Sequence, residues 1–110
     1  MRIYTQIITV ATAGTIQAVS ASGIETGLVR AIHFQGMVAN TGRVNIGTSA
    51  LVSSTGVGLI KSLGKDPGSA NDIPHWMIES PSGANDIDPS VFRVDVTVSG
   101  EKVLVTCFQA

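Results

Sequence analysis

Apolar and polar positions alternate with a period of two through most of this chain. In residues 43–47, Val44 and Ile46 lie on one parity and Arg43 and Asn45 on the other. This period is typical of a half-buried β-strand. Similar segments rich in Val, Ile and Thr are predicted as strands at 3–10, 15–19, 28–38, 43–47, 57–63, 75–79, 91–98 and 103–108. No segment keeps the 3.6-residue period of a helix, so the pattern predicts an all-β protein.

The spacing of these strands favours a particular architecture. About eight short strands, separated by turns every dozen residues, are typical of an antiparallel β-sandwich of the jelly-roll type. A chain of 110 residues has the usual size of one domain and can bury a single sandwich core. We therefore expect residues 1–110 to form a single β-sandwich domain.

Residues 28–38 form the longest apolar stretch of the chain. Leu28, Ile32, Phe34 and Val38 share one parity, and the other parity is only half polar. A strand that is apolar on both faces is either central in its sheet or covered by a partner. The turn residues Asn40-Thr41-Gly42 predict a hairpin that returns residues 43–47 beside this strand.

The segment after the 43–47 strand, residues 48–58, consists mainly of small and hydroxylated residues. Thr48 to Thr55 contains Ser53, Ser54 and Thr55, and Gly56-Val57-Gly58 closes the segment. This composition predicts a loop that leads from the 43–47 strand back to the body of the domain. It carries no catalytic signature.

The charge content is low and its distribution excludes one class of partner. Charged residues make up 14% of the chain, the formal net charge is −1, and the seven basic residues are scattered singly. Nucleic-acid binders cluster Lys and Arg on one face, so no nucleic-acid partner is expected. With 44% apolar residues, two interpretations remain: part of the surface is buried against partners, or Ser, Thr and Gly supply a neutral exposed surface.

The single cysteine and the hydropathy pattern bear on the compartment. Cys107 has no partner for an internal disulfide, which fits a reducing compartment, and its place in a strand predicts a buried side chain. Polar residues interrupt the N-terminal apolar run, which predicts no signal peptide. No stretch approaches the roughly 18 apolar residues that cross a bilayer, so we expect a soluble chain with no membrane partner.

Candidate chemistry is sparse. His33 and His75 lack metal-ligand spacing, and the chain has no HExxH, CxxC, GxSxG or GK[ST] motif, so no enzyme activity, metal site or cofactor is expected. Two similar loops, at 67–74 and 81–89, each place Asn-Asp-Ile before a proline. Their aspartates Asp72, Asp86 and Asp88 either cap turns or supply oxygen ligands to Ca²⁺. Trp76 is either a core or interface residue, or a platform for a sugar ring.

Several short motifs together resemble the small structural proteins of tailed bacteriophages. The motifs are Asn40-Thr41-Gly42, Val44-Asn45-Ile46-Gly47, Ser53-Ser54-Thr55-Gly56 with Leu59, the opening segments 6–12 and 15–18, and the closing segments 94–100 and 103–105. The chain departs from that family where Ile60–Asp66 stand in place of a compact Pro-Gly-Glu turn, which indicates a specialised loop. The resemblance implies a virion β-sandwich without catalysis, most simply a capsid decoration (cement) protein.

This resemblance carries further expectations. It implies a location on the capsid surface of a virion made in the bacterial host cytoplasm. The implied partners are the major capsid protein and neighbouring copies of the chain, associated as a symmetric trimer or by edge-strand pairing. Two alternatives remain: a tail, collar or fibre module, and a carbohydrate-binding module. The candidate partner-contact residues are Arg43, Asn45, Ser53, Ser54, Thr55 and Trp76.

Overall fold

The described residues contain eight strands, and the 3-10 turn η2 precedes the seventh of them. The computed structural model describes residues 1–20, 23, 27–64 and 75–110. The strands are β1 (Arg2–Thr9), β2 (Gln17–Ala18), β3 (Ala31–Gly36), β4 (Arg43–Val52), β5 (Val57–Gly64), β6 (His75–Glu79), β7 (Arg93–Val96) and β8 (Lys102–Gln109). The 3-10 turn η2 spans Pro89–Val91. The predicted all-β class is confirmed.

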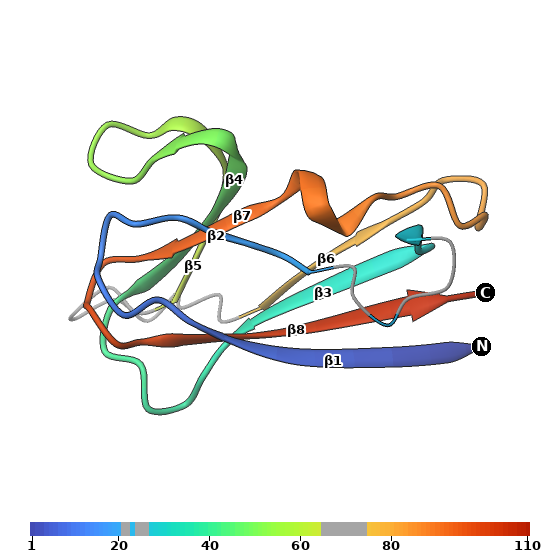
Figure 1. Ribbon diagram of the computed structural model, residues 1–110, viewed down its shortest axis with the longest axis horizontal. Coiled ribbons are helices and arrows are strands. Elements are labelled where there is room, and N and C mark those ends of the chain that lie inside the picture. Colours follow the sequence, from blue (N-terminus) through green and yellow to red (C-terminus); the bar gives the residue numbers. More distant parts are fainter. Residues whose placement is uncertain (21–22, 24–26, 65–74) are drawn as a thin grey trace.

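The strands form two four-stranded sheets that face each other. Sheet A has the order β1-β8-β3-β6, and sheet B has the order β2-β7-β4-β5. All pairs are antiparallel, and the first strand pairs with the last, the second with the seventh, the third with the sixth and the fourth with the fifth. The chain is thus one long hairpin folded over into two layers (Figure 1). This arrangement is the jelly roll that the strand spacing predicts.

The core lies between the inner faces of the two sheets. Ile32 and Phe34 of β3 meet residues such as Val44 and Val94 of sheet B, and all four are at most 1% exposed. The ring of Phe34 lies between the rings of Trp76 and Phe92, with centroid distances of 6.0 and 5.8 Å. The core forms between the sheets because every second side chain of each strand points into this layer.

Cys107 belongs to the inner face of β8 and is buried, as predicted. Burial raises the pKa of its thiol to about 11. The thiol is therefore protonated at neutral pH, and it behaves as a small apolar side chain within the core.

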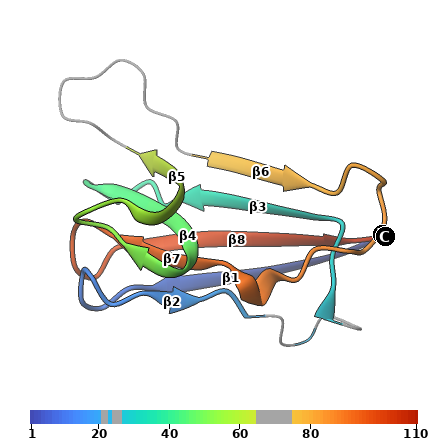
Figure 2. The same cartoon turned by 90° about the horizontal axis from the view of Figure 1, so that it is seen from above.

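The predicted 28–38 strand is shorter in the structure. β3 covers only Ala31–Gly36, while Leu28 and Val38 lie outside it and are 37% and 89% exposed. β3 lies between β8 and β6 (Figure 2), so the apolar character of both parities reflects a central strand. The strand ends where the chain leaves sheet A for sheet B.

The predicted hairpin at residues 40–42 is wrong. Residues 43–47 do not return beside β3 but cross to sheet B, where β4 pairs with β5 and β7. The backbone N–H of Gly42 donates to Oε1 of Glu101 at 2.8 Å, and the Asn40 side chain donates to the carbonyl of Lys102 at 2.7 Å. These contacts from the β7–β8 turn hold the connection in place. Turn composition locates the reversal but does not choose the pairing partner.

Three other boundaries differ from the prediction. β4 continues to Val52, which pairs with Val57 of β5 beyond a register irregularity, so the predicted loop shrinks to the turn after it. The strand expected at 15–19 pairs only at Gln17–Ala18. The strand expected at 91–98 begins at Arg93, since Asp88 caps the preceding 3-10 turn, and it ends at Val96.

Candidate functional site

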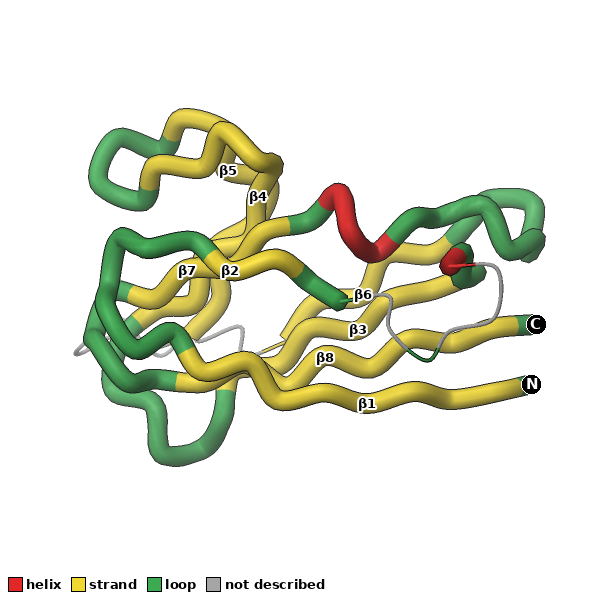
Figure 3. The backbone as a smooth tube through the Cα atoms, viewed as in Figure 1, coloured by secondary structure: helices red, strands yellow, loops and turns green. Residues whose placement is uncertain are grey.

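The end of the β4–β5 hairpin presents a neutral, partly apolar surface. We call residues 48–60 the hairpin tip; this stretch contains no charged residue. Its exposed aliphatic side chains are Val52, Val57, Leu59 and Ile60, with exposed fractions of 45%, 55%, 40% and 47%. The hairpin tip stands off one end of the sandwich (Figure 3). Projecting aliphatic side chains without charge are typical of a surface that packs on a partner.

A bend at two glycines sets the direction of the hairpin tip. The pairing of β4 with β5 shifts register on both sides of Gly47, as at a β-bulge. A Cβ on Gly47 would lie 2.4 Å from the carbonyl oxygen of Gly58, so only glycine permits this approach. Gly58 has a φ of +71° and packs closely against the backbone of Ala50 and Leu51. The two glycines let the hairpin turn away from sheet B.

Asp95 anchors the hairpin tip to the body of the domain. Its carboxylate is fully buried and accepts hydrogen bonds from the Ser53 hydroxyl at 2.6 Å and from the Gly14 N–H at 2.9 Å. The N–H of Val96 also donates to it, at 2.8 Å. The donors come from three segments, so one carboxylate fixes the β1–β2 turn and the hairpin tip against β7. Leu51 adds a buried apolar contact.

We expect Asp95→Ala to lower the free energy of unfolding by about 2–3 kcal/mol, because buried N–H and O–H donors lose their acceptor. Asp95→Asn keeps an acceptor oxygen and can donate to Ser53, so we expect it to cost clearly less. Urea unfolding followed by fluorescence of Trp76 measures both values. Equal losses for the two variants would contradict the anchoring role of the carboxylate.

A second polar cluster lies beside the anchor on β4 and β5. Nε of Arg43 donates to the Ser62 hydroxyl at 2.8 Å, and this hydroxyl donates to Oδ1 of Asn45 at 2.7 Å. Asn45 is 5% exposed and Arg43 is half-buried. The cluster therefore joins the two strands of the hairpin below its bend.

The predicted contact residues thus lie in three different environments: the hairpin tip, the polar cluster and, for Trp76, the core. Ser54 and Thr55 are exposed at the hairpin tip, and Ser53 beside them is bonded to Asp95. Arg43 and Asn45 belong to the polar cluster with Ser62 on β4 and β5.

Trp76 points into the sandwich and packs against Phe34, which is the core alternative of the sequence analysis. The structure therefore brings only the three hydroxylated residues together at one exposed point of the molecule.

The aspartate loops show capping in their described part. Asp88 accepts hydrogen bonds from the N–H and the hydroxyl of Ser90, at 2.9 and 2.7 Å. These two bonds lower the pKa of the Asp88 carboxyl. Asp86 lies at 3.5 Å from the Ser82 hydroxyl, and Asp72 lies outside the described residues. Within the described ranges no three His, Cys, Asp or Glu side chains are grouped to hold a metal ion.

The two histidines lie close together on the outer face of sheet A. Their ring centroids are 5.5 Å apart. Burial, and secondarily charge on His75, lowers the pKa of His33. His33 is therefore neutral at pH 7, and the pair is not joined by an acidic or cysteine side chain that would complete a metal site in the described structure.

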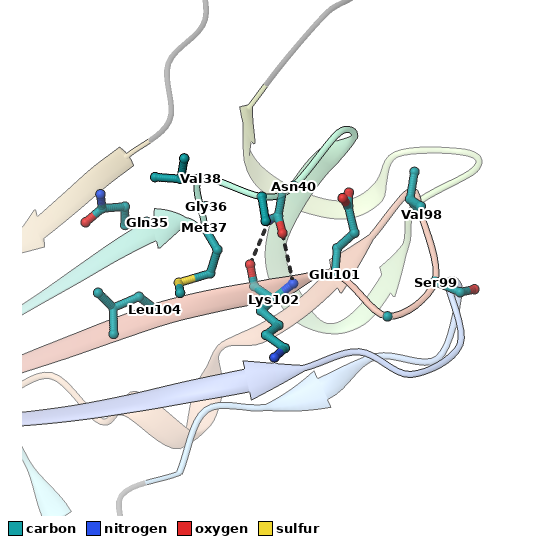
Figure 4. A pocket seen from close by; sticks show the side chains of 12 residues that line it. Gln35, Gly36, Met37, Val38, Asn40, Val98, Ser99, Glu101, Lys102 and Leu104 are labelled. Atoms are coloured by element: carbon teal, nitrogen blue, oxygen red, sulfur yellow. Dashed lines mark hydrogen bonds between the residues drawn. The ribbon is translucent and has the colours of Figure 1, made fainter.

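A hollow of about 640 Å³ lies where the β3–β4 connection meets the β7–β8 turn (Figure 4). Met37, Val38 and Leu104 supply apolar parts of its wall. Asn40 on its rim is bonded to the Lys102 backbone, and the carboxylate of Glu101 accepts from the N–H groups of Thr41 and Gly42. These polar groups form hydrogen bonds within the turn, so those bonds stabilise the turn and do not point to a ligand.

Sequence reasoning missed the aliphatic side chains of the hairpin tip as a surface. Val57, Leu59 and Ile60 were expected only as part of a short strand. Their exposure depends on the bend at Gly47 and Gly58, which turns this part of β5 away from the core. The pair of glycines on opposite strands was the available signal, because glycine within a strand often marks a bulge.

Fold and surface together define a class: a jelly-roll sandwich with eight described strands and an anchored, uncharged hairpin tip at one end. Comparison with known proteins finds no family model, no curated protein and no solved structure that matches the chain. Among the described residues, no helix has the length and apolar character that a membrane crossing requires. The functional argument therefore rests on the geometry of this chain.

Proposed function

We propose that this protein is a non-catalytic structural protein of a virion that binds the outer capsid shell as a decoration protein. The observation that carries the proposal is the hairpin tip, with four exposed aliphatic side chains and no charge. Burial of such a surface against a complementary partner lowers the free energy, because apolar side chains are removed from water. The Ser, Thr and Gly residues between these side chains keep the tip neutral.

Anchoring of the hairpin tip supports a binding role. A contact element that is already ordered loses little conformational entropy on binding. Here Asp95 holds Ser53, and the bend at Gly47 and Gly58 fixes the direction in which the tip projects. The tip also contains one of the motifs on which the phage resemblance rests, Ser53-Ser54-Thr55-Gly56 with Leu59.

The jelly-roll fold by itself does not choose this function, because the same fold serves capsid proteins, lectins and cupins. The lectin-like alternative placed its sugar site at Trp76 and the two Asn-Asp-Ile loops. Since the ring of Trp76 packs on Phe34 inside the sandwich, this alternative loses its aromatic platform. Binding through the hairpin tip is the reading that the described surface supports best.

Quantitative mass spectrometry of purified virions of the encoding phage tests the location. We expect hundreds of copies per particle, in fixed ratio to the major capsid protein. A few copies in multiples of three or six would place the protein in the tail or collar. Absence from the particles would overturn the proposal.

Particle binding by two matched variants tests the contact surface. Val57→Asp puts a charge on the hairpin tip, and Val91→Asp puts one on η2, where the parent side chain is equally exposed (55% and 57%). We expect Val57→Asp to weaken binding to undecorated capsids at least about tenfold, while Val91→Asp binds normally. Equal binding by both variants would show that the hairpin tip is not the contact.

A further inference from the structure

The outer face of sheet A is an ordered surface on which apolar and polar side chains are equal in number. Side chains that point away from the core form three rows across the four strands β1, β8, β3 and β6. The first row is Ile3, Phe108, Ala31 and Glu79; the second is Thr5, Thr106, His33 and Met77; the third is Ile7, Leu104, Gln35 and His75. We call these twelve residues the outer face. Ile3, Ile7 and Met77 are 59%, 58% and 41% exposed.

Glu79 carries the negative charge of the outer face, and Lys102 of β8, which points the same way, lies one row beyond the third row. Glu79 ends the first row on the edge strand β6, and His75 ends the third row on the same strand. His33 in the middle row has a lowered pKa, so its ring adds no charge at pH 7. A face without a dominant sign of charge can pack on a copy of itself without repulsion.

We propose that a second copy of the chain packs on the outer face, related by a two-fold axis that crosses the strands along the middle row. This operation exchanges the first row of one copy with the third row of the other. Ile3 then lies over the partner's Ile7, and Phe108 lies over the partner's Leu104. Glu79 comes next to the partner's His75, a hydrogen-bond donor in its protonated form and in one neutral form.

The charge pattern selects this axis over the other face-to-face possibility. A two-fold axis parallel to the strands would keep each row but reverse its order. That packing would put Glu79 over the partner's Ile3 and bury a carboxylate against an aliphatic side chain without a partner, which is unfavourable. The axis across the strands pairs Ile3 with Ile7, Phe108 with Leu104 and the acid with a histidine, and it places Ala31 over the partner's Gln35.

The size of the outer face is sufficient for a specific dimer. Four strands at about 4.8 Å spacing and five residues at about 3.4 Å rise, with their side chains, cover an area of about 20 by 25 Å. Two copies together then bury on the order of 1,000 Å², which is the minimum for a biological interface and corresponds to a weak, concentration-dependent dimer. The inference does not depend on the capsid proposal, because the hairpin tip projects from sheet B and the outer face belongs to sheet A.

Sedimentation equilibrium across micromolar concentrations tests the association. We expect a monomer–dimer equilibrium for the natural chain and at least about tenfold weaker association for Ile7→Lys and for Ile3→Lys. Val91→Lys is the control, since Val91 is as exposed as Ile7 (57% and 58%) but lies on η2. A monomer at all concentrations, a trimer, or a dimer that survives both face variants overturns the proposal. Circular dichroism confirms that each variant is folded.

Crosslinking with a short bismaleimide tests the axis. Cys107 is buried and protonated, so only introduced cysteines react. A mixture of Ile3→Cys and Ile7→Cys chains is expected to give crosslinked heterodimers. A mixture of Ile3→Cys and Glu79→Cys chains is expected to give few, because the axis across the strands places these positions on opposite edges. The reverse yields would overturn the proposed axis.

Discussion

Replacing Phe34 by alanine is expected to lower the free energy of unfolding by about 3–5 kcal/mol. The side chain is fully buried, and its ring packs between Trp76 on one side and Phe92 on the other. Removal leaves a cavity at the centre of the sandwich. Two aromatic contacts are lost at the same time.

Phe108→Ala provides the matched control for this prediction. Phe108 has the same ring but lies half-buried on the outer face of sheet A. In the monomer we expect its loss to cost about 1 kcal/mol, since much of the ring already contacts water. Chemical denaturation at low protein concentration measures both variants. Similar losses for Phe34→Ala and Phe108→Ala would contradict the assignment of Phe34 to the centre of the core.

Gly58→Ala is expected to lower the free energy of unfolding by about 2–5 kcal/mol. Its positive φ disfavours any residue with a Cβ by about 1–2 kcal/mol. In addition, that Cβ would lie 2.8 Å from backbone atoms of Ala50 and Leu51, so the two strands of the hairpin must separate. The bend of the hairpin tip depends on this close approach.

Gly56→Ala separates the two contributions. Gly56 also has a positive φ, of 77°, but nothing lies within 4 Å of the position its Cβ would take. We expect Gly56→Ala to lose only the conformational part, about 1–2 kcal/mol. Amide spectra should show that Gly58→Ala disturbs residues 50, 53 and 95, whereas Gly56→Ala leaves them unchanged. Equal effects of the two variants would argue against crowding at Gly58.

The sequence predicted strands well because alternation reports directly on burial of one face. Val94 and Val96 point inward, as their parity indicates, and Val44 and Ile46 do the same from β4. Pairing was harder to predict. The turn at residues 40–42 indicated a reversal, but the strand that follows pairs with β7, some fifty residues later in the chain. The composition of a turn cannot indicate which distant strand the chain will pair with.

The candidate site was predictable only in outline. The composition of residues 48–58 indicated an exposed neutral segment, and Ser54 and Thr55 are exposed there. Asp95 looked like an ordinary outward-facing residue of its strand. It is buried because Gly14 and Ser53, which are distant in the sequence, cover it. The structure therefore adds the anchor, and parity alone could not have indicated it.

The pairing of the first strand with the last has a consequence for synthesis of the chain on the ribosome. β8 lies between β1 and β3 in sheet A. The backbone edges of β1 and β3 that pair with β8 therefore stay unpaired until β8 has been synthesised. Among the described strands, only β4 and β5 pair with their neighbour in the sequence. A nascent chain can therefore close the central hairpin early, while the apolar residues of β1 stay exposed. We expect folding of this domain to be completed only once β8 has left the ribosome, at the slow rates typical of non-local β-pairing.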